Sequence, residues 1–130
     1  MSIYNKINVA IVGATGYTGL DLAYILSKHP RVKIEHLCAT KNLGKKISFF
    51  DKRIKRKLPK ISSIKKINWM NLHLVFLSLP NGEAQKLIKK IYFKNKNLRF
   101  IDLSADFRIS NTKIFKKNYK IEHKAKQLIN

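Results

Sequence analysis

The chain has little of three features that would each indicate a particular class of protein: cysteine, acidic residues and long hydrophobic runs. Its 130 residues include one cysteine, which excludes an internal disulfide and favours a reducing compartment. The stretch Ile7–Leu20, which has no charged residue, carries glycines and threonines and is too short to span a bilayer. Residues 1–6 lack the continuous apolar core of a secretory signal. We therefore expect a cytoplasmic protein with no membrane partner.

Acidic residues are scarce: seven Asp and Glu stand against 28 Lys and Arg, which gives a formal net charge of +21. In other proteins such an excess points to nucleic acid or to an anionic membrane surface. Lys, Ile and Asn are all heavily used here, however, and all three have codons rich in A and T. A base-composition bias therefore explains much of the excess without a partner, and the test is whether the positive charge gathers on one face.

The spacing of apolar residues predicts one α/β domain over residues 1–130, with a poorly defined tail at 109–130. Strands are expected at Ile7–Val12, Val32–Cys38, Leu72–Leu79 and Leu98–Leu103, and a first helix at Thr18–Lys28. A second helix is expected after Pro80-Asn81-Gly82, capped by Asn81, with an apolar stripe at Ala84, Leu87, Ile88, Ile91 and Tyr92. Strands alternating with helices favour a doubly wound, mostly parallel, Rossmann-like sheet. The lysine-rich segment, Lys41–Asn68, has broken periodicity and is interpreted as a variable surface excursion.

Seven residues between the first strand and the first helix, GATGYTG, form a glycine loop at Gly13–Gly19. Gly13 allows a tight turn, Gly16 lets the backbone approach a diphosphate, and Gly19 allows close packing of helix on strand. Backbone N–H groups at the helix start would meet the phosphate charge. A bare βα turn without ligand is the competing interpretation, which the flanking strand and helix disfavour. The predicted dinucleotide contacts are Gly13, Ala14, Thr15, Gly16, Tyr17, Thr18 and Gly19.

The end of the second strand bears on the choice between NAD and NADP. A carboxylate there would bond the ribose 2′-hydroxyl, whereas a basic or hydroxyl group suits a 2′-phosphate. Glu35 is the nearest acid, but at about 3.3 Å per residue it lies roughly 10 Å back from Cys38 along the strand. Thr40 and Lys41 are therefore our hypothesis for the 2′-phosphate contacts, and NADP for the cofactor. The alternative is that Lys41 is one more solvated lysine.

Three motifs together resemble one enzyme family: GATGYTG at residues 13–19, LSLPNGEA at 77–84 and IDLSADFRI at 101–109. They closely resemble the amino-terminal part of the N-acetyl-γ-glutamyl-phosphate reductases. The resemblance implies NADPH-dependent reduction of N-acetylglutamyl phosphate to the semialdehyde, in arginine biosynthesis, by a longer chain that forms a homo-oligomer. It also implies that Pro80, Asn81 and Ser104 lie beside the cofactor. Asp102, Asp106 and Arg108 match family positions near the cofactor and the domain junction.

The family's chemistry needs a cysteine thiolate to form a thioester and a histidine to handle protons. By resemblance, that cysteine falls shortly beyond the last residue of this sequence. Cys38, on the adenosine side of the expected cofactor, is interpreted as a small packing residue. His123 matches a family histidine, but the tail around it departs from the family pattern. We therefore assign no catalytic residue and no metal ligand, and expect the chain alone to bind NADP without turnover.

Two other functions stay open at this point. Aspartate-semialdehyde dehydrogenases have a similar glycine loop, although the Ala105–Arg108 run argues against them. The stretch Lys45–Lys66 has ten Lys or Arg residues against Asp51 alone, so a non-catalytic module that binds nucleic acid is the second alternative. No recognisable nucleic-acid-reading motif accompanies that stretch.

Overall fold

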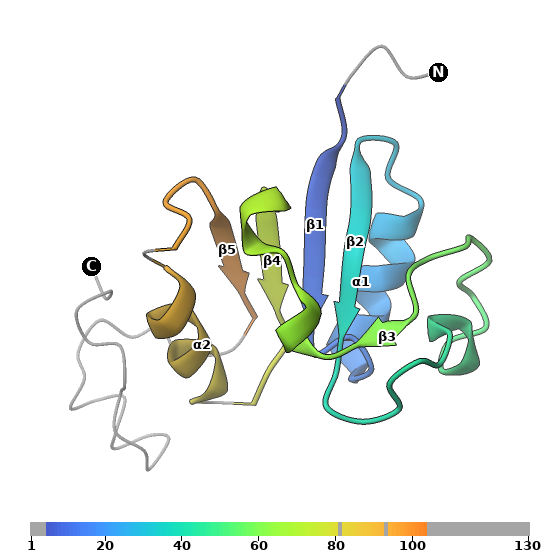
Figure 1. The fold of residues 1–130 in the computed structure, drawn as a ribbon. Coiled ribbons are helices and arrows are strands. Elements are labelled where there is room, and N and C mark those ends of the chain that lie inside the picture. The colour runs from blue at the N-terminus through green and yellow to red at the C-terminus, as the bar shows by residue number, and fades with distance from the viewer. Residues whose placement is uncertain (1–4, 81, 93, 104–130) are drawn as a thin grey trace.

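The computed structural model describes residues 5–80, 82–92 and 94–103 of the chain. Its centre is a sheet of five parallel strands in the order β3-β2-β1-β4-β5 (Figure 1). The strands are β1 (Ile7–Val12), β2 (Val32–Cys38), β3 (Ile61–Ser62), β4 (Leu74–Leu77) and β5 (Arg99–Asp102). The predicted parallel α/β sheet is therefore confirmed for this part of the chain.

The first two strands have the predicted bounds, and the last two are shorter than predicted. β4 covers four residues of the predicted Leu72–Leu79, because its ladder with β1 runs only from Leu74 to Leu77. β5 pairs with those same four residues and is limited to their length. The length of a strand is thus set by its partner as well as by its own residues.

The helices α1 (Tyr17–Ser27) and α2 (Glu83–Ile91) cover opposite faces of the sheet, so the fold is doubly wound as predicted (Figure 1). α1 ends where the N–H of Lys28 bonds the carbonyl of Ile25, two residues before Pro30. In α2 the predicted stripe is buried at Ala84, Ile88 and Ile91, but Tyr92 follows the helix and is exposed. Gly82 takes the N-cap position of α2.

The hydrophobic core is divided in two by the sheet, because alternate residues of a strand point to opposite faces. On the α1 side, Ile11, Ala23 and Leu37 pack together. On the α2 side, Ala10 and Val12 pack with the buried residues of β4 and α2. β1 is buried on both faces, which explains why its sequence is a continuous apolar run.

The interpretation of the lysine-rich segment as a surface excursion is wrong in part. It contains β3 and the 3₁₀ turns η1 (Ile47–Phe49) and η2 (Ile64–Lys66), and η3 (Trp69–Asn71) follows it. Ile47, Ile54 and Ile61 are all buried in the core on the α1 side. Its lysines face solvent while single isoleucines pack inward, and such isolated anchors leave no periodic signal in the sequence.

Several predicted residues lie outside the described residues. These are Asn81, with its predicted cap, the loop Ser104–Arg108 with Ser104, and the tail with His123. Among the residues that are described, no helix has the length and apolar character needed to cross a membrane.

Candidate functional site

The candidate site lies at the carboxyl ends of the parallel strands. Val12 pairs with Cys38 on one side and with Leu77 on the other, so β1, β2 and β4 end at the same level of the sheet. The chain first crosses from β1 to β2 and later crosses to β4, on the other side of β1. Ligands of open α/β sheets bind at such a switch point, beyond the carboxyl ends of the strands. The glycine loop follows β1 at this position (Figure 1).

Gly13 is required by the fold itself. Its φ of +86° lies in the left-handed region, which strains any residue with a side chain. A Cβ at this position would lie 2.0 Å from the Ser78 carbonyl oxygen. The N–H groups of Gly13 and Ala14 both donate to the Cys38 carbonyl, at 2.9 and 3.0 Å. These bonds hold the beginning of the glycine loop against the end of β2.

Gly19 is also required by the fold. It is buried in the first turns of α1, and a Cβ there would lie 2.1 Å from the Gly13 carbonyl oxygen and 2.8 Å from the Ala14 Cα. The close packing predicted for this glycine is therefore present, with the first turn of the loop as its partner. Without it, α1 could not begin directly over the end of β1.

Gly16 differs from both of these glycines. It is the N-cap of α1 with φ −75° and ψ 169°, a conformation open to any residue. The nearest atom to a Cβ there would be the Gly13 carbonyl oxygen, at 3.8 Å, and the residue is exposed. Within the described residues no side chain caps this helix start, and no acidic residue lies in its first turn. Tyr17 and Thr18 are exposed beside it, and Thr15 is half-buried.

The loop after β2 lies next to the glycine loop, and β3 fixes it. The Ala39 N–H donates to the Ser62 carbonyl at 3.2 Å, and the Gly44 N–H donates to the Ile61 carbonyl at 2.7 Å. Between these two anchors Thr40 and Lys41 are exposed, at the end of β2 where the sequence predicted them. Glu35 is ion-paired with Lys33 at 3.1 Å and lies within β2, away from its end.

Of the other predicted cofactor contacts, only Pro80 lies among the described residues. It is exposed in the connection between β4 and α2, where its carbonyl accepts a hydrogen bond from the Glu83 N–H at 3.1 Å. The structure therefore places the glycine loop, the loop after β2 and Pro80 at one end of the sheet. Ser78, whose carbonyl fills the space above Gly13, was not predicted, since only its backbone matters and its side chain gives no signal.

Cys38 is a buried packing residue, as predicted. Its side chain is 1% exposed and belongs to the core on the α2 side. Burial raises the pKa of the Cys38 thiol to about 11, against a weaker lowering by the Ser62 hydroxyl, whose Oγ lies 4.0 Å from the sulfur. A thiol with that pKa holds almost no thiolate at neutral pH, so Cys38 is not equipped as a nucleophile.

Comparison with known proteins agrees with this geometry. Residues 8–125 match the family described as semialdehyde dehydrogenase, NAD binding domain. The chain is 41% identical over 116 residues to N-acetyl-gamma-glutamyl-phosphate reductase of Ehrlichia ruminantium (strain Gardel), covering 88% of this chain and 33% of that protein. It is 36% identical over 126 residues to the reductase of the same name from Rhodospirillum rubrum, covering 95% of this chain and 36% of that protein. It thus spans about a third of the length of these relatives.

The fold has solved counterparts. A crystal structure of aspartate semialdehyde dehydrogenase with NADP from Candida albicans superposes with a TM-score of 0.62 at 22% identity, covering 83% of this chain and 32% of that chain. This likeness concerns the fold alone. Together with the family match over nearly the whole sequence, it leads to one conclusion: the chain belongs to the family of semialdehyde dehydrogenase NAD-binding domains.

Proposed function

We propose that this chain is the dinucleotide-binding part of an N-acetyl-γ-glutamyl-phosphate reductase and that it binds NADP. The names of its relatives support the reductase over the aspartate enzyme, because both relatives described above carry that name. The family supports a nicotinamide dinucleotide, and a structural neighbour holds NADP. The whole enzyme would act in the cytoplasm as a homo-oligomer and reduce N-acetylglutamyl phosphate to its semialdehyde.

The observation that carries the proposal is the openness of Gly16. The fold requires Gly13 and Gly19, but nothing in the described chain lies close enough to Gly16 to require a glycine. A glycine there does leave room for a diphosphate to approach the backbone at the start of α1. The N–H groups in the first turn of a helix lack partners within that helix and would be free to donate to such a ligand, and the positive end of the helix dipole favours its charge.

The remaining cofactor contacts are assigned from the positions of residues around the carboxyl ends of the strands. Thr15 and Thr18 would donate hydroxyl hydrogen bonds to the diphosphate, flanked by Ala14 and Tyr17. Thr40 and Lys41 would hold the 2′-phosphate, because they lie in the exposed loop after β2. Pro80, with Asn81 and Ser104 by resemblance, would line the nicotinamide side.

The cofactor supplies the hydride of the reduction when it is bound. The one cysteine of this sequence is buried with a raised pKa, so it cannot displace phosphate from the acyl substrate. We therefore propose that these 130 residues alone bind NADP without turnover. An assay of the purified chain with NADPH and the acyl phosphate tests this directly. Steady oxidation of NADPH that depends on the acyl phosphate would contradict it.

Cofactor binding is tested by fluorescence titration of the chain with NADPH and with NADH. We expect NADPH to bind more tightly, and Gly16→Val to weaken it by roughly tenfold or more, because the new side chain fills the approach to the backbone. The matched control is Ile25→Ala, on an exposed position further along α1. A preference for NADH would overturn the 2′-phosphate contacts, and undiminished binding by Gly16→Val would overturn the site.

A further inference from the structure

A basic cleft lies in the lysine-rich segment, and no residue of the glycine loop lines it. Its volume is about 450 Å³, within the usual range of small-molecule sites. Five of its lining residues are cationic: Lys46, Lys55, Arg56, Lys57 and Lys60. None of the lining residues is acidic. The cleft therefore gathers like charges in one hollow.

No counter-charge within this part of the chain relieves that repulsion. The stretch Lys45–Lys66 contains one acidic residue, Asp51, and its carboxylate is already bound by Arg53, at 2.7 Å. Hydrogen bonds from Arg53 hold the pKa of Asp51 below its usual range. Arg53 itself does not line the cleft. Among the described residues, the ion pairs involve none of the five cleft cations.

Arg53 fastens the segment that carries the cleft to α1. Its guanidinium lies 2.6 Å from the Asp21 carboxylate and stacks over the Tyr24 ring, 4.5 Å from the ring centre. The next residue, Ile54, is buried in the core on the α1 side and also lines the cleft. The cations are therefore carried by a segment fixed at two adjacent positions, so a ligand would not have to order it.

The cleft has an apolar part as well as a charged part. Leu58, which is half-buried, supplies apolar lining beside the five cations, and the cleft also borders the core residues Ile47 and Ile54, each 3% exposed. An inorganic anion would use only the cations, whereas a nucleotide presents both phosphate charge and an apolar base. Arg56 adds a planar fork of donors that can bind a phosphate through two hydrogen bonds.

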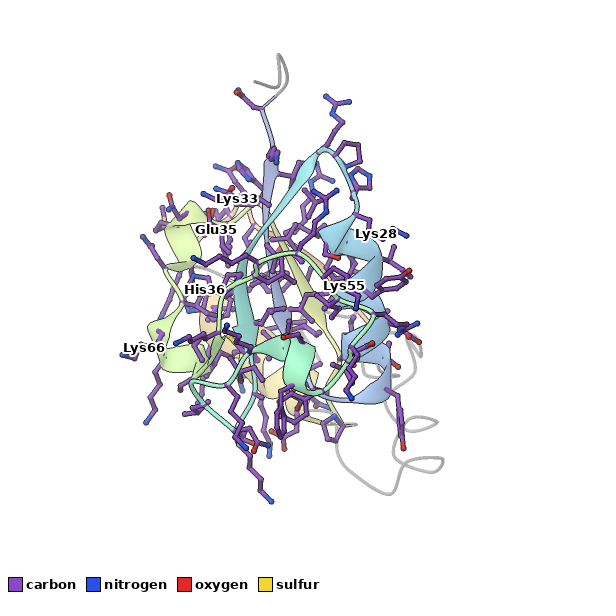
Figure 2. The ribbon with its side chains drawn as sticks, turned by 90° about the vertical axis from the view of Figure 1, so that its right-hand side faces the viewer. Lys28, Lys33, Glu35, His36, Lys55 and Lys66 are labelled. Carbon is purple, nitrogen blue, oxygen red and sulfur yellow. The ribbon has the colours of Figure 1, made fainter. Side chains whose placement is uncertain are left out.

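We propose that the basic cleft is a second binding site, for a nucleoside polyphosphate. Its chemistry favours a compact ligand over a long nucleic acid, which would need a continuous basic face. In the view of Figure 2, Lys33 lies near the top, Lys66 at the left, and Lys28 and Lys55 at the right. Lys86, Lys89 and Lys90 lie on α2, which covers the other face of the sheet.

The test is a titration of the full chain at 0.15 M salt, followed by ¹H–¹⁵N NMR, with ATP, tripolyphosphate and adenosine as probes. We expect ATP to shift the amides of Ile54–Leu58 and Lys60 and to bind at least threefold more tightly than tripolyphosphate, because only ATP also meets the apolar lining. Adenosine alone should bind more weakly than either. Tripolyphosphate binding as tight as that of ATP would overturn the nucleotide assignment, as would ATP shifts confined to Gly13–Gly19.

Two double variants distinguish binding in the cleft from non-specific attraction to the positive charge of the whole chain. Lys55→Gln with Arg56→Gln should weaken ATP binding roughly tenfold, because two exposed phosphate contacts are lost. Lys89→Gln with Lys90→Gln removes the same charge from exposed positions on α2 and should change the affinity less than about twofold. Equal weakening by both pairs would overturn the site. A ten-nucleotide RNA that binds more tightly than ATP and is equally sensitive to the first pair would overturn the choice of ligand.

Discussion

The glycine loop and the lysine-rich segment both contribute residues to the core on the α1 side but are specified in opposite ways. In the glycine loop, each of two glycines has a backbone oxygen within 2.1 Å of the position that a Cβ would take, so no other residue type fits there. In the lysine-rich segment, buried isoleucines and one arginine hold an irregular chain through partners distant in sequence. The first kind of region can be identified from the sequence, and the second depends on the completed fold.

The largest loss of stability is expected from a substitution in the glycine loop. Gly13→Ala places a methyl group on the Ser78 carbonyl at a φ of +86°, so the loop must move away from β4. We expect a loss of about 3 kcal/mol or more in the free energy of unfolding, measured by urea denaturation. Gly16→Ala is the matched control, since its methyl group meets nothing closer than 3.8 Å. Equal losses for the two variants would contradict the distinction drawn between these glycines.

The next effect tests whether the lysine-rich segment is part of the core. Ile54 is 3% exposed, and Ile54→Ala should lower the free energy of unfolding by about 2–4 kcal/mol through lost burial and a cavity. Lys55→Ala, one residue further along and exposed, should change it by less than about 0.5 kcal/mol. Denaturation curves of both variants measure the difference. A neutral Ile54→Ala would restore the interpretation of this segment as a surface excursion.

Much of the fold follows from the sequence because its signals are local. The apolar run Ile7–Val12 and the stretch Val32–Cys38 became strands with the predicted bounds, and the glycines between them fixed the start of α1. β3 could not be predicted, because two residues form a strand only when β2 offers them a partner. The Asp21–Arg53 pair joins residues 32 positions apart, and no local pattern indicates which of many basic residues reaches which acid. The position of Thr40 and Lys41 after β2 could likewise be predicted, because it depends on the local sequence. The hydrogen bonds to β3 that hold their loop could not, because they depend on residues about twenty positions away.

A smaller effect is expected at Cys38, where the two regions meet. Its carbonyl receives the N–H groups of Gly13 and Ala14, and its thiol faces Ser62 of β3. The pKa of the thiol is about 11 in the folded chain and 9.0 when free, so the folded state holds this proton more tightly. The contribution of this thiol to the free energy of unfolding is therefore fully present below about pH 9 and is lost as the pH rises toward 11.

We expect the stability of the wild-type chain to fall by roughly 1–3 kcal/mol more than that of Cys38→Ala between those pH values. Urea denaturation at a series of pH values measures both slopes. Iodoacetamide should also label the native thiol far more slowly than the thiol of the chain in urea. Parallel slopes for the two proteins, or rapid labelling of the native chain, would mean that the thiol is accessible.

The smallest effect concerns the ion pair that joins the lysine-rich segment to α1. Asp21→Asn removes the negative charge from the contact at 2.6 Å but leaves Arg53 bound to Asp51, so only the link between the two elements is weakened. Because both partners are exposed, the loss of global stability should be slight and should disappear at 1 M salt, where the screening length is about 3 Å. A larger change is expected in the local protection of the Ile54 amide, which donates to the Asp51 carbonyl at 3.2 Å beside this pair.

Hydrogen exchange measures this local opening at single amides. In Asp21→Asn the Ile54 amide should exchange faster, because the segment opens more often from α1, while the amides of β1 keep their protection. Glu83→Gln is the control: it removes a pair of similar exposure with Lys86, three residues away in the same helix, and should leave Ile54 unchanged. Faster exchange at Ile54 in both variants would show that charge in general, and not this contact, holds the segment. Unchanged exchange in both would leave the buried isoleucines as its anchors.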